Sequence, residues 1–169
     1  MNGVRDKGYT LIELTVVMVL IGLMLAISIP RVRFSLVTDN LKSTTRRIIG
    51  IVRDIRNEAI TGQKAYLFHL DLEANRLWVE FAGMGEEERT VAQERSFTFP
   101  NDIKILDVWQ RTKGKQIDGE VAIRFSKKGY VDYTVIHLGA EDGREFTIVL
   151  SPFLGTIKSY EKYVDIVPS

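Results

Sequence analysis

"KGYTLIELTVVMVLIGLMLAISIP", residues 7–30, decides how the chain begins, and its residues 14–29 carry no charge. As a helix at ~1.5 Å per residue, residues 9–29 would span about 31 Å, close to the roughly 30 Å hydrocarbon core of a bilayer. A secretory signal usually has only about 7–15 apolar residues. The run therefore predicts a membrane-inserted helix over residues 9–30. A plain membrane anchor, or a signal peptide cut near Ser28, is the alternative.

One charge, Glu13, lies near the start of this apolar run. A charge at mid-bilayer costs roughly 2.5–3.5 kcal/mol, so Glu13 needs a partner or a task. Basic residues stand on both sides, with Arg5 and Lys7 before the run and Arg31 and Arg33 after it. The positive-inside rule alone would place most of the chain, the part after the apolar run, in the cytoplasm. Because the rule is weak for long translocated domains, the orientation of the helix stays open.

A second helical pattern follows over residues 31–62. Its apolar residues recur at steps of three, four or seven: Phe34, Val37, Leu41, Ile48, Val52, Ile55 and Ala59. This spacing predicts an amphipathic helix with one buried face. Pro30 lacks an amide hydrogen and would kink the helix rather than break it. One helix from Tyr9 to Thr61, about 80 Å long, is expected, with Gly62 as its stop.

From residue 64 the hydrophobic period becomes two, which predicts strands. The segment "YLFHLDLEANRLWVEF" reads as a hairpin with its turn at Asp71 to Asn75, and "MGEEERTVAQE" and "RTKGKQIDG" read as a surface loop and a turn. Further strands are expected at residues 97–99, 103–109, 120–125, 131–138, 145–150 and 156–160. Together these features predict an α+β fold, a long N-terminal α-helix packed on an antiparallel β-sheet or sandwich head.

The composition excludes several classes of protein. Hydrophobic residues make up 45% and charged residues 27%, which suits a folded head. The 23 Lys and Arg nearly balance the 22 Asp and Glu, so bulk charge does not favour a nucleic-acid partner. There is no cysteine, which excludes disulfides and thiolate metal sites.

Candidate chemical sites are few, and we expect no catalytic, cofactor or metal site. His69 and His137 are the only histidines, and each falls in an expected strand. A zinc site or a triad would need distant groups to converge, so we expect structural strand histidines. The acidic run at residues 86–88 reads as solvated, and the acidic pair at residues 141–142 offers a weak calcium alternative. The basic loop at residues 111–115 and the pair at 127–128 could bind phosphates, but a solvated surface is expected.

The start of the chain resembles the processing site of type IV prepilins and type II secretion pseudopilins. A short basic leader ends in Gly8, and "YTLIE" and the long apolar run follow. The resemblance implies cleavage by a prepilin peptidase between Gly8 and Tyr9, with N-methylation of Tyr9. Tyrosine at that position is a mild departure, because the family usually has phenylalanine. Pro30 matches a helix-bending proline that is common in these proteins.

The same resemblance gives Glu13 a role. After cleavage its carboxylate would compensate the new amine of Tyr9, and during assembly it would pair with the amine of a neighbouring subunit. An unpaired buried charge is strongly penalised, so this pairing would set the register between subunits. The partners implied are other pseudopilins or pilins, the prepilin peptidase, the inner-membrane assembly platform and membrane lipid.

The head is similar to that of H-type minor pseudopilins and the related minor pilins of the FimT group. The resemblance rests on "IRF", a glycine turn, the strand "VDYTVIH", a second glycine turn, "FTIVL" and "GTI". It implies a leader at 1–8, a transmembrane assembly helix at 9–30, an amphipathic helix at 31–62 and a periplasmic head at 63–169. The expected role is a non-enzymatic minor pseudopilin, anchored in the bacterial inner membrane by one span, that primes or caps the secretion pseudopilus. A type IV minor pilin, in assembly or DNA uptake, and a membrane-anchored ligand-binding or enzymatic β domain remain the alternatives.

Overall fold

The computed structural model describes the backbone of residues 10–152 and 156–165, and the side chains of residues 10–24, 40–152 and 156–165. The chain divides into two compact units, residues 1–36 and 37–169. Helix α1, Leu11–Gly62, is 52 residues long and contributes to both units. The predicted helix is therefore confirmed to within two residues at its described ends, while the predicted kink at Pro30 lies outside the described side chains.

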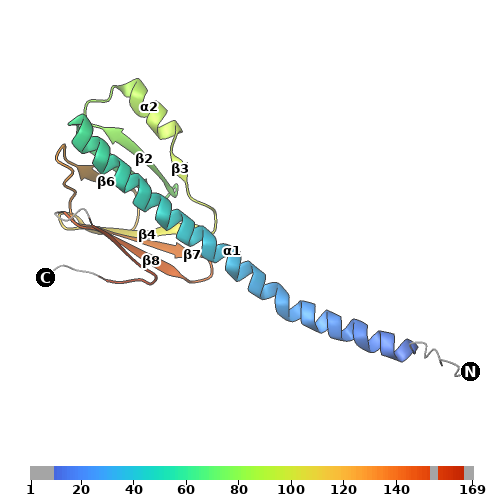
Figure 1. Ribbon diagram of the computed structural model, residues 1–169. Coiled ribbons are helices and arrows are strands. Elements are labelled where there is room, and N and C mark those ends of the chain that lie inside the picture. Colours follow the sequence, from blue (N-terminus) through green and yellow to red (C-terminus); the bar gives the residue numbers. More distant parts are fainter. Residues whose placement is uncertain (1–9, 153–155, 166–169) are drawn as a thin grey trace, which may run out of the picture. The chain divides into compact units, whose positions relative to one another are not determined.

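The part of α1 in the second unit packs through the predicted apolar face. Leu41, Ile48, Val52, Ile55 and Ala59 are all buried. They recur at helical spacing, so they share one face of the helix. The other two members of the predicted face, Phe34 and Val37, lie outside the described side chains. Figure 1 shows this part of α1 crossing both sheets of the head.

The C-terminal end of α1 differs in one detail from the prediction. Gly62 is the last helical residue, and the left-handed conformation that often ends a helix falls on Gln63, at φ +49°. This conformation usually favours glycine. The Gln63 side-chain amide donates a hydrogen bond of 2.8 Å to the carbonyl of Ile60, which satisfies one of the last carbonyls of the helix.

The first sheet has four antiparallel strands in the order β3-β2-β1-β6. Their bounds are β1 Tyr66–Asp71, β2 Arg76–Phe81, β3 Phe97–Thr98 and β6 Glu120–Phe125. The hairpin of β1 and β2 is confirmed, with Phe68 opposite Val79. Its turn holds Asn75 at φ +52°, and the Asn75 side chain bonds the backbone of Ile103 and Ile105 at 2.6 and 3.1 Å. The turn is thereby tied to the second sheet.

The second sheet has five antiparallel strands in the order β5-β4-β7-β8-β9. Their bounds are β4 Ile103–Gln110, β5 Gly114–Gln116, β7 Thr134–Ala140, β8 Glu145–Leu150 and β9 Ile157–Tyr160. Strand β5 corrects the prediction that "RTKGKQIDG" is only a turn. Gly114, at φ +73°, turns the chain so that three residues pair back onto β4. Such a short edge strand has too few residues to show an alternating pattern.

Strand β4 contains a β-bulge between Ile105 and Asp107. Ile105 pairs with Leu138, but Asp107 pairs with His137, so Leu106 is the extra residue. The insertion exchanges the two faces of the strand at this point. A Cβ on Gly139 of β7 would lie 2.8 Å from the Leu106 side chain, so glycine at that position makes room for the extra residue.

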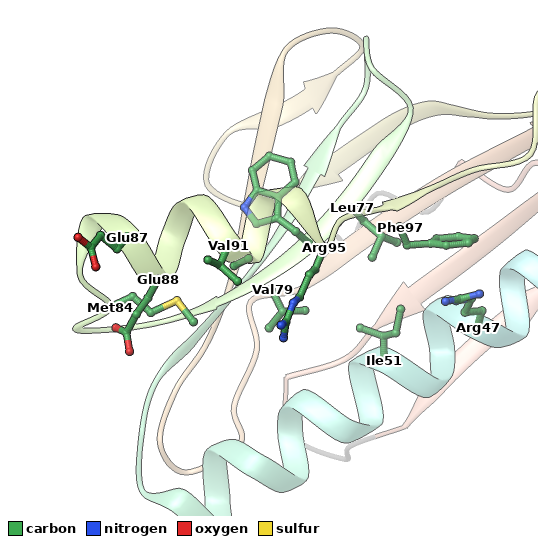
Figure 2. A pocket seen from close by; sticks show the side chains of 12 residues that line it. Arg47, Ile51, Leu77, Val79, Met84, Glu87, Glu88, Val91, Arg95 and Phe97 are labelled. Carbon is green, nitrogen blue, oxygen red and sulfur yellow. The ribbon is translucent and has the colours of Figure 1, made fainter.

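Residues 86–94, predicted as a surface loop, form helix α2, Glu86–Glu94. Three glutamates occupy its first turn, where negative charge is favoured by the helix dipole. The carboxylate of Glu88 accepts a hydrogen bond of 3.0 Å from the backbone N–H of Gly85, which caps the helix. α2 has no buried residue, so hydrophobic periodicity gave no signal for it. In Figure 2, Val91 of α2 lies on the side of the helix that faces Val79 of β2.

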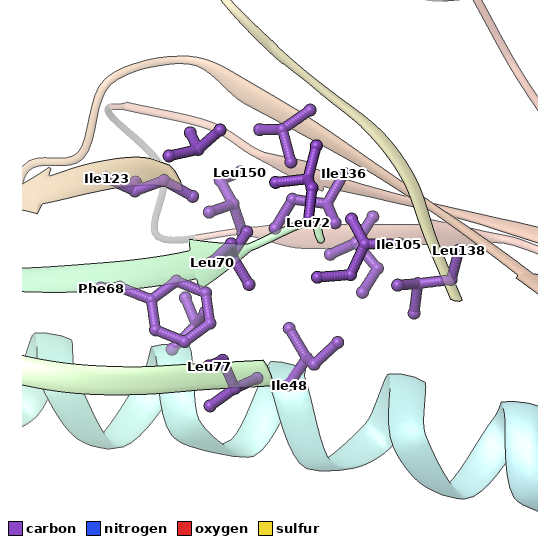
Figure 3. Close-up of a cluster of buried hydrophobic side chains, with 14 of the residues drawn as sticks. Ile48, Phe68, Leu70, Leu72, Leu77, Ile105, Ile123, Ile136, Leu138 and Leu150 are labelled. Atoms are coloured by element: carbon purple, nitrogen blue, oxygen red, sulfur yellow. The ribbon is translucent and has the colours of Figure 1, made fainter. Parts of the chain in front are cut away.

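The hydrophobic core lies where α1 and the two sheets meet. Ile48 from the helix, Phe68 and Leu77 from the first sheet, and Ile136 and Leu138 from the second belong to one buried cluster. Figure 3 shows these side chains converging above the helix. Burying each large aliphatic or aromatic side chain contributes about 1.5–3 kcal/mol. The head is thus an α+β unit in which the helix face predicted from the sequence supplies one wall of the core.

Candidate functional site

The first turn of α1 holds Glu13, the predicted assembly residue. Thr10 stands just before the helix, and its carbonyl accepts hydrogen bonds from the N–H groups of Glu13 and Leu14, at 3.0 and 3.2 Å. The Thr10 hydroxyl oxygen lies 3.4 Å from the Glu13 nitrogen. Thr10 therefore caps the helix, and the Glu13 carboxylate belongs to its positive end.

The apolar side chains of the first unit are exposed along the described part of α1. Leu11 is 88% exposed and Met24 is 72% exposed. The Thr15 hydroxyl donates a hydrogen bond of 2.8 Å to the Leu11 carbonyl, so this polar group is satisfied within the helix. Within the described residues, no helical stretch is both long and apolar enough to count as a membrane span. The predicted span at residues 9–30 includes Tyr9 and the side chains of 25–30, which lie outside them.

The predicted processing residues Gly8 and Tyr9 lie outside the described residues, as does the side chain of Pro30. Of the four predicted processing and assembly residues, only Glu13 is therefore described with its side chain. The cleavage position and the pairing of Glu13 with the new amine stay predictions.

His137 is the centre of a polar cluster on the outer face of the second sheet. Its Nδ1 lies 2.7 Å from Asp107 Oδ1, and its Nε2 lies 3.1 Å from the Val164 carbonyl oxygen. The Tyr163 ring stacks on the imidazole at 3.8 Å between centroids, and its hydroxyl donates to Asp107 Oδ2 at 3.0 Å. Lys115 completes the cluster, donating to the Tyr163 hydroxyl at 2.8 Å.

This cluster fixes residues 161–165, which we call the C-terminal segment, to the sheet. Thr147 on β8 holds the same segment from a neighbouring strand. Its hydroxyl donates to the Lys162 carbonyl at 2.8 Å and accepts from the Val164 N–H at 3.0 Å. The segment thus crosses a row of polar side chains that the register of β4, β7 and β8 aligns.

Burial and hydrogen bonding shift the pKa values of His137 and Asp107 in opposite directions. Burial alone would lower the pKa of His137, but the bonds to Asp107 and to the Val164 carbonyl raise it above its ordinary value. Burial alone would raise the pKa of Asp107, but hydrogen bonds from His137, Tyr163 and Lys115 lower it. Both ring nitrogens of His137 face acceptors, so the imidazolium is the form that satisfies both.

The same geometry argues against chemistry at His137. A general base or a metal ligand needs a free ring nitrogen, and both nitrogens of His137 are engaged within the protein. Among the described residues, no three His, Cys, Asp or Glu side chains are placed to hold a metal ion. The cluster is therefore a structural fastening of the C-terminal segment.

His69 lies on the outer face of the first sheet, stacked on Trp78 at 4.9 Å between ring centroids. Its Nδ1 lies 2.6 Å from Glu120 Oε1, while its Nε2 lies 3.7 Å from Glu80 Oε2 and makes no hydrogen bond within the described residues. Glu80 also accepts a hydrogen bond of 3.0 Å from the Trp78 indole nitrogen. Arg89 of α2 approaches Glu80 at 3.9 Å.

The other sequence candidates have ordinary structural surroundings. Asp142, half of the possible calcium pair, binds the Arg144 guanidinium through Nε at 2.7 Å. Lys115, from the basic loop, is held by Tyr163 and lies 3.3 Å from Asp107, so it is not free to bind phosphate. The glutamates at residues 86–88 belong to α2 rather than to a loop.

A groove of about 700 Å³ lies between α1, α2 and the edge of β2. Its lining is mainly apolar and includes Ile51, Val79, Met84, Val91 and Phe97. Sequence reasoning missed this groove because it depends on α2, which the hydrophobic pattern did not reveal. It also missed the polar row under the C-terminal segment. The signal available was Asp107, an ionisable residue inside a predicted strand.

Comparisons with known proteins point to one group. Residues 4–29 match the family model described as the prokaryotic N-terminal methylation motif. Type II secretion system protein H of Pseudomonas aeruginosa is 31% identical over 69 residues, which cover 41% of this chain. The match spans only 40% of the length of that relative.

The fold of the head also has solved counterparts. A crystal structure of the minor pseudopilin EpsH from the type II secretion system of Vibrio cholerae superposes with a TM-score of 0.55 at 13% identity. It covers 76% of this chain and 98% of that one. A second EpsH structure gives a TM-score of 0.52 at 12% identity, with 73% and 98% coverage. At this identity the likeness concerns the fold.

Proposed function

We propose that this chain is a minor pseudopilin of a type II secretion system, of the H type within the type IV prepilin and pseudopilin superfamily. The N-terminal methylation motif, the match to a type II secretion system protein H and the EpsH-like fold of the head support this proposal. In this role it is a structural subunit without catalysis of its own, and it primes or caps the pseudopilus that drives protein export. The observation that carries the proposal is the methylation motif at residues 4–29 in a chain whose head has the EpsH fold.

The proposed processing and assembly of the protein begin in the inner membrane. The apolar half of α1 anchors it by one span, and the head lies in the periplasm. A prepilin peptidase cuts between Gly8 and Tyr9 and methylates Tyr9. The assembly platform then inserts the chain among other pseudopilins. The nearly continuous exposure of apolar side chains over residues 11–24 supports a helix whose partners are lipid and neighbouring subunits.

We assign Glu13 to pairing with the amine of a neighbouring subunit. The residue lies in the first turn of α1, and a mature N-terminus at Tyr9 would lie about one helical turn before it. Within its own chain, Glu13 can compensate that amine. In the filament, a subunit lacking the carboxylate would leave a buried amine unpaired, which is strongly penalised.

Intact mass and N-terminal analysis of the membrane protein, produced with and without a prepilin peptidase, test the pathway. The expected product lacks residues 1–8 and carries one methyl group on Tyr9. Gly8→Val, which adds a branched side chain at the cut, should stay unprocessed, whereas Gly3→Val in the same leader should be processed normally. An uncut wild-type chain, or one cut near Ser28, would refute the proposal.

Glu13→Gln tests assembly separately from processing. It should be cut and methylated like the wild type but should be lost from pseudopili sheared from cells that produce the other pseudopilins. Thr10→Ser, which keeps the capping hydroxyl, is the matched control and should assemble. Incorporation of Glu13→Gln at the wild-type level would contradict the role assigned to the carboxylate. Incorporation of the wild type into retractile pili instead would favour the type IV minor pilin.

A further inference from the structure

The outer edge of β2 is only partly covered. β3 has two residues and pairs with Arg76 and Leu77, and the chain then leaves the edge to connect with α2. Beyond Leu77 the edge continues through Val79 to Phe81 without a partner strand among the described residues. A row of unpaired backbone groups on an edge is a template for another strand.

Two hydrogen bonds show which backbone groups point to this edge. The Ala82 N–H donates to the Ala65 carbonyl at 2.7 Å, so even-numbered residues of β2 bond toward β1. The Phe99 N–H donates to the Asn75 carbonyl at 3.0 Å, so odd-numbered residues bond toward the β3 side. The N–H and C=O of Val79 therefore point to the free edge. The Phe81 carbonyl is taken by the Met84 N–H at 3.2 Å.

The groove lies along this free edge and has two apolar walls. Ile51 of α1 forms one wall, and Val91 and Met84 lie on the other, beside α2. Val91 is 44% exposed, so its side chain is available for contact. A helix could fill the volume, but it has no free backbone groups to pair with Val79. An extended chain pairs with Val79 and directs alternate side chains to the two walls.

Charges mark the two ends of the groove. Arg47 lies toward the β3 end beside Phe97, Glu87 and Glu88 lie toward the start of α2, and the Arg95 side chain lies between them in the view, near Val79 (Figure 2). Arg47 sits 4.0 Å over the Phe97 ring, which fixes its position. Neither Arg95 nor Glu87 forms an ion pair within the part of the chain described here. A segment with an acidic residue at one end and a basic residue at the other complements both.

We propose that this groove binds an extended apolar segment of a different subunit of the same filament, which adds as a short strand to β2 beside Val79. The inference rests on the proposed function, because that function supplies the neighbouring subunit. The segment carries apolar residues on both faces, an acidic residue near Arg47 and Arg95, and a basic residue near Glu87.

Val79→Pro tests the backbone pairing. Proline removes the Val79 N–H, which faces the free edge together with the Phe81 N–H, and leaves the ladder to β1 intact. Such edge positions tolerate proline. The variant should be processed and remain in the membrane, but should be recovered with the other pseudopilins at least about tenfold less than the wild type. Val79→Thr, which keeps the N–H and the branched shape, should be recovered normally. Equal recovery of Val79→Pro and wild type would overturn the proposal.

Val91→Glu tests the α2 wall, with Gln93→Glu as a control of the same charge change on an exposed position of the same helix. Only Val91→Glu should reduce recovery. Amide exchange of the full chain gives a direct readout of the edge. The Val79 amide should exchange fast in the chain alone and about tenfold or more slower with the other pseudopilins, while the β1-bonded Trp78 amide is protected in both.

The outcomes separate this proposal from the function on which it rests. Loss of processing or of all incorporation by the wild type would contradict the function. Normal processing and incorporation of the wild type, with Val79→Pro and Val91→Glu unaffected, would overturn the groove proposal alone. Protection of the Val79 amide in the chain alone at high concentration would assign the groove to a second copy and would also overturn the proposal.

Discussion

The outer faces of the two sheets each bury a histidine, His137 on β7 and His69 on β1, yet they hold it differently. Both ring nitrogens of His137 face acceptors, Asp107 and the Val164 carbonyl. Only one nitrogen of His69 is within hydrogen-bond distance of an acceptor, the Glu120 carboxylate. Its ring also stacks on Trp78.

The segments next to the two sheets differ as well. The C-terminal segment over His137 is bound by hydrogen bonds from three strands, through Asp107, His137 and Thr147. Helix α2 has no buried residue, and its ion pair to the first sheet, Arg89 with Glu80, is long at 3.9 Å. The comparison teaches that buried hydrogen bonds hold the C-terminal segment to its sheet, while a long, half-exposed ion pair links α2 to its own.

The largest expected effect comes from removing the carboxylate of the better-bonded cluster. Asp107→Ala leaves His137 buried without its counter-charge and takes a partner from Tyr163. We expect the free energy of unfolding to fall by about 3–5 kcal/mol, measured by urea denaturation in detergent. Glu80→Ala removes the acceptor of the Trp78 indole and should cost less, about 1–3 kcal/mol.

Asp118→Ala is the control for this pair, since Asp118 is an exposed carboxylate on the loop after β5. It should change the free energy of unfolding by no more than about 0.5 kcal/mol. The contrast between the two faces would be lost if Asp107→Ala cost no more than Glu80→Ala.

A change of pH should have a smaller effect on the free energy of unfolding. The pKa of folded His137 is raised, so the folded protein holds a proton that the unfolded chain releases first. The stability it contributes is present below the ordinary histidine pKa and is lost as pH rises through the folded value. Asp107, with a lowered pKa, contributes stability above the ordinary aspartate value that is lost as pH falls through its folded pKa. The free energy of unfolding should therefore decline as the pH rises above the ordinary histidine pKa of about 6.5.

Variants of the two histidines show which group causes this decline in the free energy of unfolding. Urea denaturation at a series of pH values should show the decline in the wild type and in His69→Gln, but a flatter profile in His137→Gln. Asp107 and Tyr163 of the cluster face His137, and the Lys115 charge acts on it in the opposite sense to Asp107. A decline that survives in His137→Gln would assign it to other groups.

The smallest effect should come from the link between α2 and the first sheet. Arg89 is about half exposed, and its bond to Glu80 is long. Arg89→Ala should lower the free energy of unfolding by less than about 1 kcal/mol, as exposed ion pairs usually do. Tyr163→Phe removes the hydroxyl bonded to Asp107 and Lys115 and should cost more. If Arg89→Ala cost more than Tyr163→Phe, α2 would be more firmly held to its sheet than the C-terminal segment is to the other.

Much of the fold could be predicted because burial imposes a period on the chain. Leu41, Ile48 and Val52 recur at helical spacing, and they form the buried face of α1. The hairpin followed from alternation, with Phe68 and Val79 on the same face. Element boundaries fell where turn residues such as Asn75 interrupt that alternation.

The remainder depends on contacts that leave no periodic trace. Helix α2 is stabilised by three glutamates in its first turn and by the hydrogen bond from the Gly85 N–H to the Glu88 carboxylate. Because its sequence is polar and none of its residues is buried, the sequence read as a loop. Asp107 and His137 are 30 residues apart, and the Val164 carbonyl is a further 27 away from His137. Their convergence follows from sheet register, which a single sequence does not state. The pairing of Glu13 with a mature amine remains a prediction from the resemblance alone.

The bulge at Leu106 has a consequence for how the chain tolerates changes in length. Before it, Ile103 and Ile105 face the core; after it, Val108 does, while Asp107 faces outward to His137. The extra residue thus reverses which residues of β4 face the core, and the missing side chain at Gly139 leaves space for Leu106. Losing one residue here would put every later side chain of β4 out of phase, so an insertion or deletion would be costlier in this strand than in an exposed turn.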